Sequence, residues 1–318
     1  MNKTAENNLA FLENDLSTRE AFSRAVTEVG LEDSRVFTVA ADSESRFGRF
    51  IKEAPERAFN FGIAEQNAMS IAAGLAFCGK IPFISTYATF LTMRACEQIR
   101  TDIAFANLNV RIIGTNSAFS SDWLGFTHQA LEDIGLMRAI PNMTVVVPAD
   151  GAETYHLIKE SINYQGPIYI RIRGGSPEPH ITGEEIKIGK ARLLREGSDL
   201  TLITCGRMVY EALQAAAILA GEGISVRVLD MHTIKPLDDE AVVRAAEETK
   251  GIITIEEHNI MGGLGSAVAE VTSARSPKRV ERIGIMDGFG MPGPQRDLLE
   301  HFGLTADHIV ARAREFFR

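Results

Sequence analysis

The sequence has few cysteines, no long apolar run and no excess of positive charge. Its 318 residues include three cysteines, far apart and without a Cys-x-x-Cys pair, which argues against a disulfide framework or a zinc site. No uninterrupted apolar stretch approaches the roughly 18 residues of a membrane span. The polar N-terminus lacks the apolar segment of a signal peptide. The net charge of −9 argues against non-specific binding to nucleic acid or anionic membranes, so a cytoplasmic protein is the expectation.

What the chain does contain is an alternation of strand and helix patterns. An apolar share of 45% and a charged share of 24% are typical of globular proteins. The expected strands are apolar throughout rather than alternating, which predicts parallel sheets covered on both faces. They are 36–41, 81–85, 109–114, 143–147 and 167–172, and then 200–204, 225–229, 251–255 and 280–285. The expected helices are 15–30, the segment after Glu65, 90–106, 130–138, 151–164, 210–221, 238–249 and 266–273.

A change of composition divides this alternation in two. Residues 174–189 combine glycine and proline with charge, as is typical of a linker. We therefore predict two parallel-sheet α/β domains, residues 1–176 and 177–318.

The segment 59–74 (FNFGIAEQNAMSIAAG) contains the most informative acidic residue, Glu65. A short apolar run ends at Gly62-Ile63, and a helical pattern rich in small residues follows. Such a helix packs closely, so a carboxylate at its start is poorly hydrated and should hold either a proton or a basic partner. A plain helix N-terminal glutamate, favoured by the helix dipole, is the simpler interpretation. We expect instead that Glu65 touches a cofactor.

Several motifs resemble those of the transketolase family. Residues 17–21 (STREA), 62–67 (GIAEQN), 85–91 (STYATFL), 94–100 (RACEQIR), 125–133 (GFTHQALED) and 147–151 (VPADG) resemble its pyrimidine-binding domain. Residues 228–238 (VLDMHTIKPLD) and 256–265 (EEHNIMGGLG) look like its C-terminal domain. The magnesium- and diphosphate-binding Gly-Asp-Gly motif of a full-length enzyme is absent. The chain therefore resembles the C-terminal subunit of a split transketolase.

The resemblance implies thiamine diphosphate as cofactor. Glu65 would hydrogen-bond the pyrimidine ring nitrogen, with Ile63 beside it, and Phe90 would pack on the pyrimidine face. His128 would hydrogen-bond substrate or relay protons. After Phe90, Met93 and Arg94 follow with one residue more than in some relatives. Mg²⁺ would be bound mainly by a separate N-terminal-type subunit, and two copies of each chain would form an α2β2 assembly.

The resemblance also implies a sugar-phosphate site. Arg19, Ser45 and either Arg171 or Arg173 are its expected phosphate ligands, since guanidinium groups bind phosphate bidentately. Asn116 and Leu124 stand where relatives often carry a histidine and an acid that contact donor hydroxyls. The exchange at these two positions predicts a modified or less hydroxylated sugar.

The predicted reaction is transfer of a two-carbon ketol unit from a ketose to an aldose. A 1-deoxyxylulose-phosphate-synthase-like enzyme or a 2-oxoacid dehydrogenase β-type subunit shares Glu65 and the fold, and a non-catalytic regulatory subunit is the alternative from another class. The Thr-His-Gln motif at 127–129 and the 94–100 pattern favour transketolase. The intact Glu65 argues against a purely regulatory chain.

Overall fold

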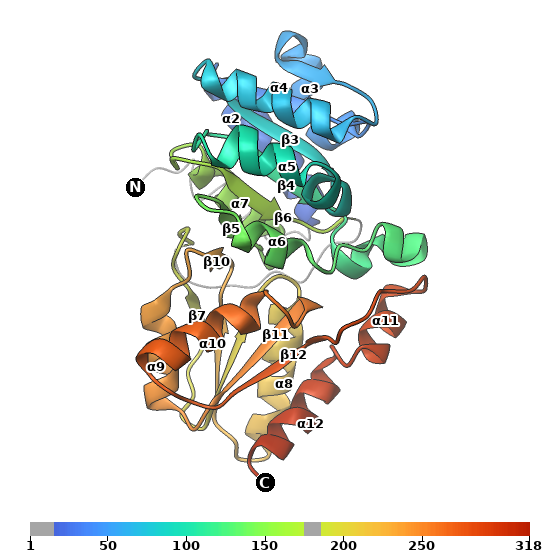
Figure 1. Cartoon of the computed structure of the whole chain (residues 1–318). Helices are drawn as coiled ribbons and strands as arrows, with labels where there is room; N and C mark the ends of the chain where they lie inside the picture. The colour runs from blue at the N-terminus through green and yellow to red at the C-terminus, as the bar shows by residue number, and fades with distance from the viewer. Residues whose placement is uncertain (1–15, 175–185) are drawn as a thin grey trace, which may run out of the picture.

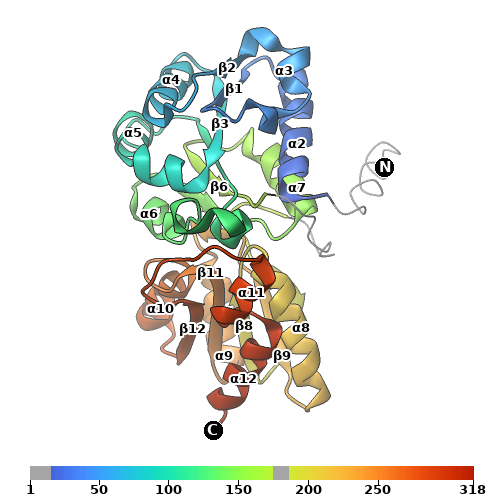
Figure 2. The same ribbon diagram turned by 90° about the vertical axis from the view of Figure 1, so that its right-hand side faces the viewer.

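The computed structural model describes residues 16–174 and 186–318, which form two α/β units (Figures 1 and 2). The first unit contains β1 (Val36–Ala40), β2 (Ala58–Asn60), β3 (Ile81–Tyr87), β4 (Arg111–Thr115), β5 (Thr144–Val146) and β6 (Ile168–Arg171). The chain then enters the second unit with β7 (Arg192–Arg195), β8 (Leu200–Thr204), β9 (Val226–Asp230), β10 (Thr233–Lys235), β11 (Ile252–Asn259) and β12 (Val280–Ile285). The prediction of two α/β sheets is confirmed.

Both sheets are mostly parallel. Their strand orders are β10-β5-β6-β4-β3-β1-β2 and β12-β11-β8-β9-β7. The antiparallel exceptions are the short strands β10 and β7, each of which lies at the edge of its sheet and pairs with a single neighbour. Edge strands need only one partner, so their direction is not fixed by a helical crossover as it is for the inner strands.

Helices cover both faces of each sheet. On the first, α2 (Thr18–Glu32) and α7 (Gly151–Ser161) lie opposite α4 (Glu65–Phe77), α5 (Cys96–Gln98) and α6 (Asp133–Ala139), with the short α3 (Phe50–Glu53) near one end (Figure 2). The second sheet carries α8 (Met208–Gly221), α9 (Asp239–Glu248), α10 (Leu264–Arg275), α11 (Gln295–His301) and α12 (Ala306–Phe316). Among the described residues, every helix is too short or too polar to cross a membrane.

One predicted helix is wrong in detail. The segment 90–106 is not a regular α-helix, since wide π-helical turns at Phe90–Arg94 and Ile99–Ala104 flank the three-residue α5. A π turn holds one extra residue in a helix and is common at functional sites. The irregularity sets the direction of the side chains at 90 and 94.

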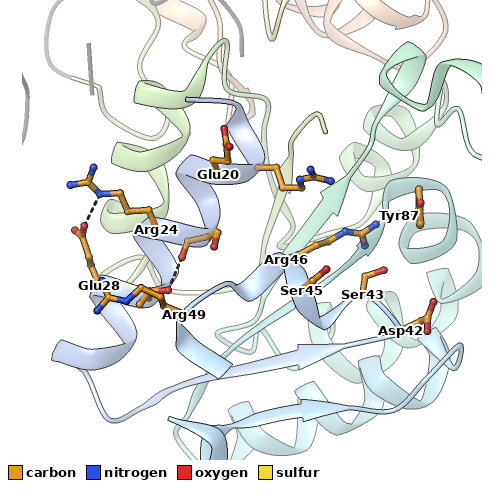
Figure 3. A pocket seen from close by; sticks show the side chains of 12 residues that line it. Glu20, Arg24, Glu28, Asp42, Ser43, Ser45, Arg46, Arg49 and Tyr87 are labelled. Atoms are coloured by element: carbon orange, nitrogen blue, oxygen red, sulfur yellow. Dashed lines mark hydrogen bonds and ion pairs between the residues drawn. The ribbon is translucent and has the colours of Figure 1, made fainter. Parts of the chain in front are cut away.

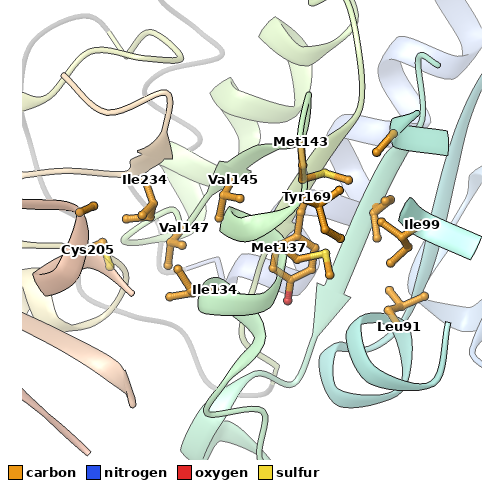
Figure 4. Close-up of a cluster of buried hydrophobic side chains, with 14 of the residues drawn as sticks. Leu91, Ile99, Ile134, Met137, Met143, Val145, Val147, Tyr169, Cys205 and Ile234 are labelled. Carbon is orange, nitrogen blue, oxygen red and sulfur yellow. The ribbon is translucent and has the colours of Figure 1, made fainter. Parts of the chain in front are cut away.

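The two units share a core at their junction. β10, which follows β9 in the second unit, pairs with β5 and completes the first sheet. One buried apolar cluster includes residues of both units, and Figure 4 shows Cys205 and Ile234 close to Val147 and Ile134. The domain boundary predicted at residues 176 and 177 falls in segment 175–185, outside the described residues, and remains a prediction.

Candidate functional site

Glu65 lies at the N-terminus of α4, after a tight turn. Gly62 in this turn has φ +67°, a conformation that favours glycine. The α4 residues Ala68 and Ala72 are fully buried, so the helix packs closely and Glu65 is only 2% exposed. One guanidinium nitrogen of Arg94, Nη1, donates to both carboxylate oxygens of Glu65 at 2.8 Å each. The poorly hydrated acid therefore holds a basic partner, which was one of the two arrangements expected.

Arg94 joins this acid to an aromatic group. Its guanidinium carbon lies 4.4 Å from the ring centroid of Phe90, within cation–π distance. The π-helical turn places both residues on one side, four positions apart. The Arg94 side chain is 45% exposed while Glu65 is buried, so Arg94 lies between the carboxylate and the solvent.

His128 belongs to the same aromatic group. The centroid of its ring lies 5.0 Å from the ring centroids of both Phe90 and Tyr87, and the rings meet edge to face in each case. The Thr89 hydroxyl donates to the His128 carbonyl, and Nδ1 of His128 is 2.9 Å from the hydroxyl of Thr127. Partial burial lowers the pKa of His128, so its imidazole is neutral near pH 7 and can accept a proton.

Tyr87 also borders a polar cavity of about 950 Å³ between α2 and the segment after β1. Arg19 from α2 and Ser45 from the short 3₁₀ turn Glu44–Phe47 both line it, so the structure brings together two of the residues predicted to bind phosphate. Figure 3 shows the side chain of Arg46, from the same turn, directed toward Tyr87.

The remaining candidates lie in different surroundings. Ile63 is 75% exposed at the turn before Glu65. Asn116, directly after β4, has φ +53° and packs against Gly174. Leu124 is exposed on the loop before His128.

Two of the predicted phosphate-binding arginines are buried near the junction of the units. Arg171 donates to Asp133 at 2.8 Å and to the carbonyls of Ala130 and Glu257. Arg173 is also buried, and its backbone exchanges hydrogen bonds with the Thr18 hydroxyl. Arg171 thus holds α6 against the second unit. Burial lowers the pKa of Arg173 to about 10.

Sequence reasoning missed three residues of this region as contributors. Arg94 is 29 positions from Glu65, and no pattern in the sequence joins them. Tyr87 stands inside the motif 85–91, and Arg46 directly follows Ser45, so proximity to predicted residues was the available signal.

The chain thus consists of two mostly parallel α/β units, the first of which has a buried acid at a helix N-terminus near aromatic rings. Family models match the transketolase pyrimidine-binding domain over residues 14–175 and the transketolase C-terminal domain over residues 189–309. The chain belongs to the transketolase family, and it corresponds to the C-terminal subunit of a split enzyme.

Relatives of similar length support this assignment. The chain is 41% identical over 300 residues to a 6-deoxy-6-sulfo-D-fructose transketolase subunit of Clostridium sp. (strain MSTE9), covering 93% of each chain. It is 39% identical over 309 residues to an apulose-4-phosphate transketolase subunit of Phocaeicola vulgatus, covering 96% of this chain and 99% of the relative. A solved structure described as a split-gene transketolase, in an inactive β4 tetramer, shares 44% identity with a TM-score of 0.88, covering 94% of this chain and 98% of that one.

Proposed function

We propose that this chain is the pyrimidine-side subunit of a thiamine-diphosphate-dependent transketolase that moves a two-carbon ketol unit from a ketose to an aldose. The observation that carries the proposal is the buried carboxylate of Glu65. Its ion-pair partner is the half-exposed Arg94, and the contacting rings of Phe90 and His128 lie nearby. A desolvated carboxyl with a displaceable partner suits a heteroaromatic ring nitrogen.

Each residue then has a defined task. Glu65 would share a proton with the ring nitrogen of the cofactor's pyrimidine, with Arg94 displaced from the carboxylate. Phe90 would pack against the face of the pyrimidine, and Ile63 would lie at the edge of the cofactor site. When bound, thiamine diphosphate supplies a nucleophilic thiazolium carbon. His128, neutral at pH 7, accepts and returns a proton at a substrate hydroxyl.

The substrate and partners follow from the same proposal. Arg19 and Ser45 bind the charged end of the sugar, and Asn116 and Leu124 face its hydroxyls. Of the two buried arginines, Arg173 is the candidate for a further phosphate contact, because Arg171 is already bonded to Asp133 and to the carbonyls of Ala130 and Glu257. The named relatives act on a sulfosugar and on apulose 4-phosphate, which supports a modified sugar here. A separate N-terminal-type subunit binds Mg²⁺ and the diphosphate, and an α2β2 assembly works in the cytoplasm.

The alternatives are less well supported. A 1-deoxyxylulose-phosphate-synthase-like or 2-oxoacid dehydrogenase β-type chain would share Glu65, but the two named relatives of matching length are transketolase subunits. No feature of the described residues favours a non-catalytic subunit.

The test is reconstitution with the N-terminal-type partner. Ketol transfer is measured with thiamine diphosphate and Mg²⁺ for the natural chain, Glu65→Gln and the control Glu97→Gln, which alters an exposed acid. We expect Glu65→Gln to lower kcat by about 10²- to 10⁴-fold, the usual contribution of a positioned acid–base group, with the control unchanged. Unchanged activity in Glu65→Gln would refute the role of Glu65, and full turnover by the chain alone would refute the split active site.

A further inference from the structure

The cavity beside Tyr87 contains more positive charge than its own acids neutralise. Four arginines line it, and two of them have carboxylate partners: Arg24 pairs with Glu28 at 2.9 Å and Arg49 with Glu53 at 2.6 Å. Arg19 and Arg46, in contrast, form no ion pair with any described residue. The cavity therefore offers two guanidinium groups to a ligand.

Glu20 and Asp42 act on these two arginines only at a distance, and no acid of the described cavity wall forms an ion pair with either of them. Glu20 is held by the Ser17 hydroxyl and backbone amide in the capping box of α2, and Glu28 also accepts a hydrogen bond from the Tyr155 hydroxyl. Asp42 is the remaining acid, exposed at the end of β1. Figure 3 shows Ser43 and Ser45 between Asp42 and Arg46, with hydroxyl groups that can donate to an oxyanion.

Arg46 is buried in an unusual way. Its side chain is 7% exposed, its guanidinium carbon lies 4.6 Å from the Tyr87 ring centroid, and its Nη1 finds no acceptor among residues 16–174 and 186–318. Burial lowers the pKa of Arg46 to about 10, the neighbouring Arg19 acts in the same direction, and Tyr87 and the exposed Asp42 offset this only in part. A buried guanidinium without a counterion is costly, and an anion in the cavity would supply both charge and acceptors.

We infer that Arg46, stacked on Tyr87 and facing the same cavity as Arg19, binds a strongly acidic terminal group of the sugar, a phosphate or a sulfonate, and selects charged donors over neutral ones. This inference rests on the proposed function and adds to it a specificity-determining residue. Tyr87 connects the two sites, since its ring also lies 5.0 Å from His128 and 5.7 Å from Phe90. A sugar with its acidic end on Arg46 would thus extend past Tyr87 toward the proposed cofactor site.

The experiment compares donors on the assembled enzyme with its N-terminal-type partner. A ketose phosphate, a ketose sulfonate and an uncharged ketose are assayed with the natural chain, with Arg46→Gln and Arg46→Lys, and with the control Arg49→Gln. Arg49 is an exposed arginine of the same cavity that already forms an ion pair with Glu53. Binding of each charged donor is also measured by calorimetry, independently of turnover.

We expect Arg46→Gln to raise KM and Kd for a charged donor by about 10- to 100-fold, the effect of one lost charge-assisted hydrogen bond. The uncharged donor should change by less than about threefold, and Arg46→Lys should fall between the natural chain and Arg46→Gln. A larger loss for the ketose phosphate or the ketose sulfonate than for the uncharged ketose supports the inference. The donor with the larger loss identifies the acidic group that Arg46 binds. Equal losses for charged and uncharged donors would overturn it and assign Arg46 a structural role. Absence of ketol transfer by the natural assembly with every donor would instead refute the proposed function.

Discussion

Removing the partner of Glu65 is the most direct perturbation of the site. In Arg94→Gln the buried carboxylate loses the nitrogen that bonds both of its oxygens at 2.8 Å. Breaking a fully buried ion pair costs about 3–5 kcal/mol, because a charge remains unpaired in the interior. The Arg94 side chain is 45% exposed, so water already screens the pair and can replace part of it. We therefore expect the free energy of unfolding to fall by about 1–2 kcal/mol.

A double-mutant cycle isolates this interaction. Urea unfolding of Arg94→Gln, Glu65→Gln and the double variant, followed by circular dichroism, should give a coupling energy of about 1–2 kcal/mol. Arg100→Gln serves as the control, since this arginine is exposed and close in sequence. The double variant should be more stable than Arg94→Gln alone, because a neutral amide tolerates burial better than an unpaired carboxylate. A coupling energy below about 0.3 kcal/mol, within the usual error of additivity, would refute the reasoning.

Two further predictions concern buried groups outside the proposed site. Arg111 is fully buried and donates to the carbonyls of Ser161, Tyr164 and Gly166, so Arg111→Met, measured by urea unfolding, should lower the free energy of unfolding by about 2–4 kcal/mol. A loss no larger than that of the exposed control Arg100→Met would contradict this role. Burial lowers the pKa of His232 below its ordinary value of 6.5, so the unfolded chain binds more protons and stability falls as pH drops below about 6.5. In His232→Gln the loss of unfolding free energy between pH 7 and pH 5 should be smaller by at most about 2 kcal/mol, the limit for an imidazole that stays neutral in the folded state. An unchanged pH slope would show that other groups cause the loss.

The main elements of the fold could be predicted because they have a strong periodic signal. Inner strands such as β4 and β8 are continuously apolar, and a parallel sheet buries both of their faces. The short strands β2, β7 and β10 were not predicted, whereas β5, also three residues long, was predicted because it lies in the apolar run 143–147. β10 exists because β5 offers it an unpaired edge, which is a tertiary effect.

The candidate site could be predicted only in part for a similar reason. Glu65, Phe90 and His128 stand in recognisable motifs, and the structure places Phe90 and His128 in contact and joins Glu65 to Phe90 through Arg94. The contribution of Arg94 depends on the π turn, which no hydrophobic period in the sequence predicts. The contribution of Arg46 depends on which arginines of the cavity form ion pairs with carboxylates, and tertiary packing decides this. The assignment of roles to these residues remains the proposal above.

The strand shared between the two units has a consequence for biosynthesis. A ribosome makes β5 about 87 residues before β10, so at about 5–20 residues per second the edge of the first sheet stays unpaired for several seconds. An open strand edge can pair with other chains. Nascent chains of this protein are therefore most vulnerable to aggregation after residue 146 has left the ribosome and before residue 235 has followed, and this is the interval in which a chaperone would help folding most.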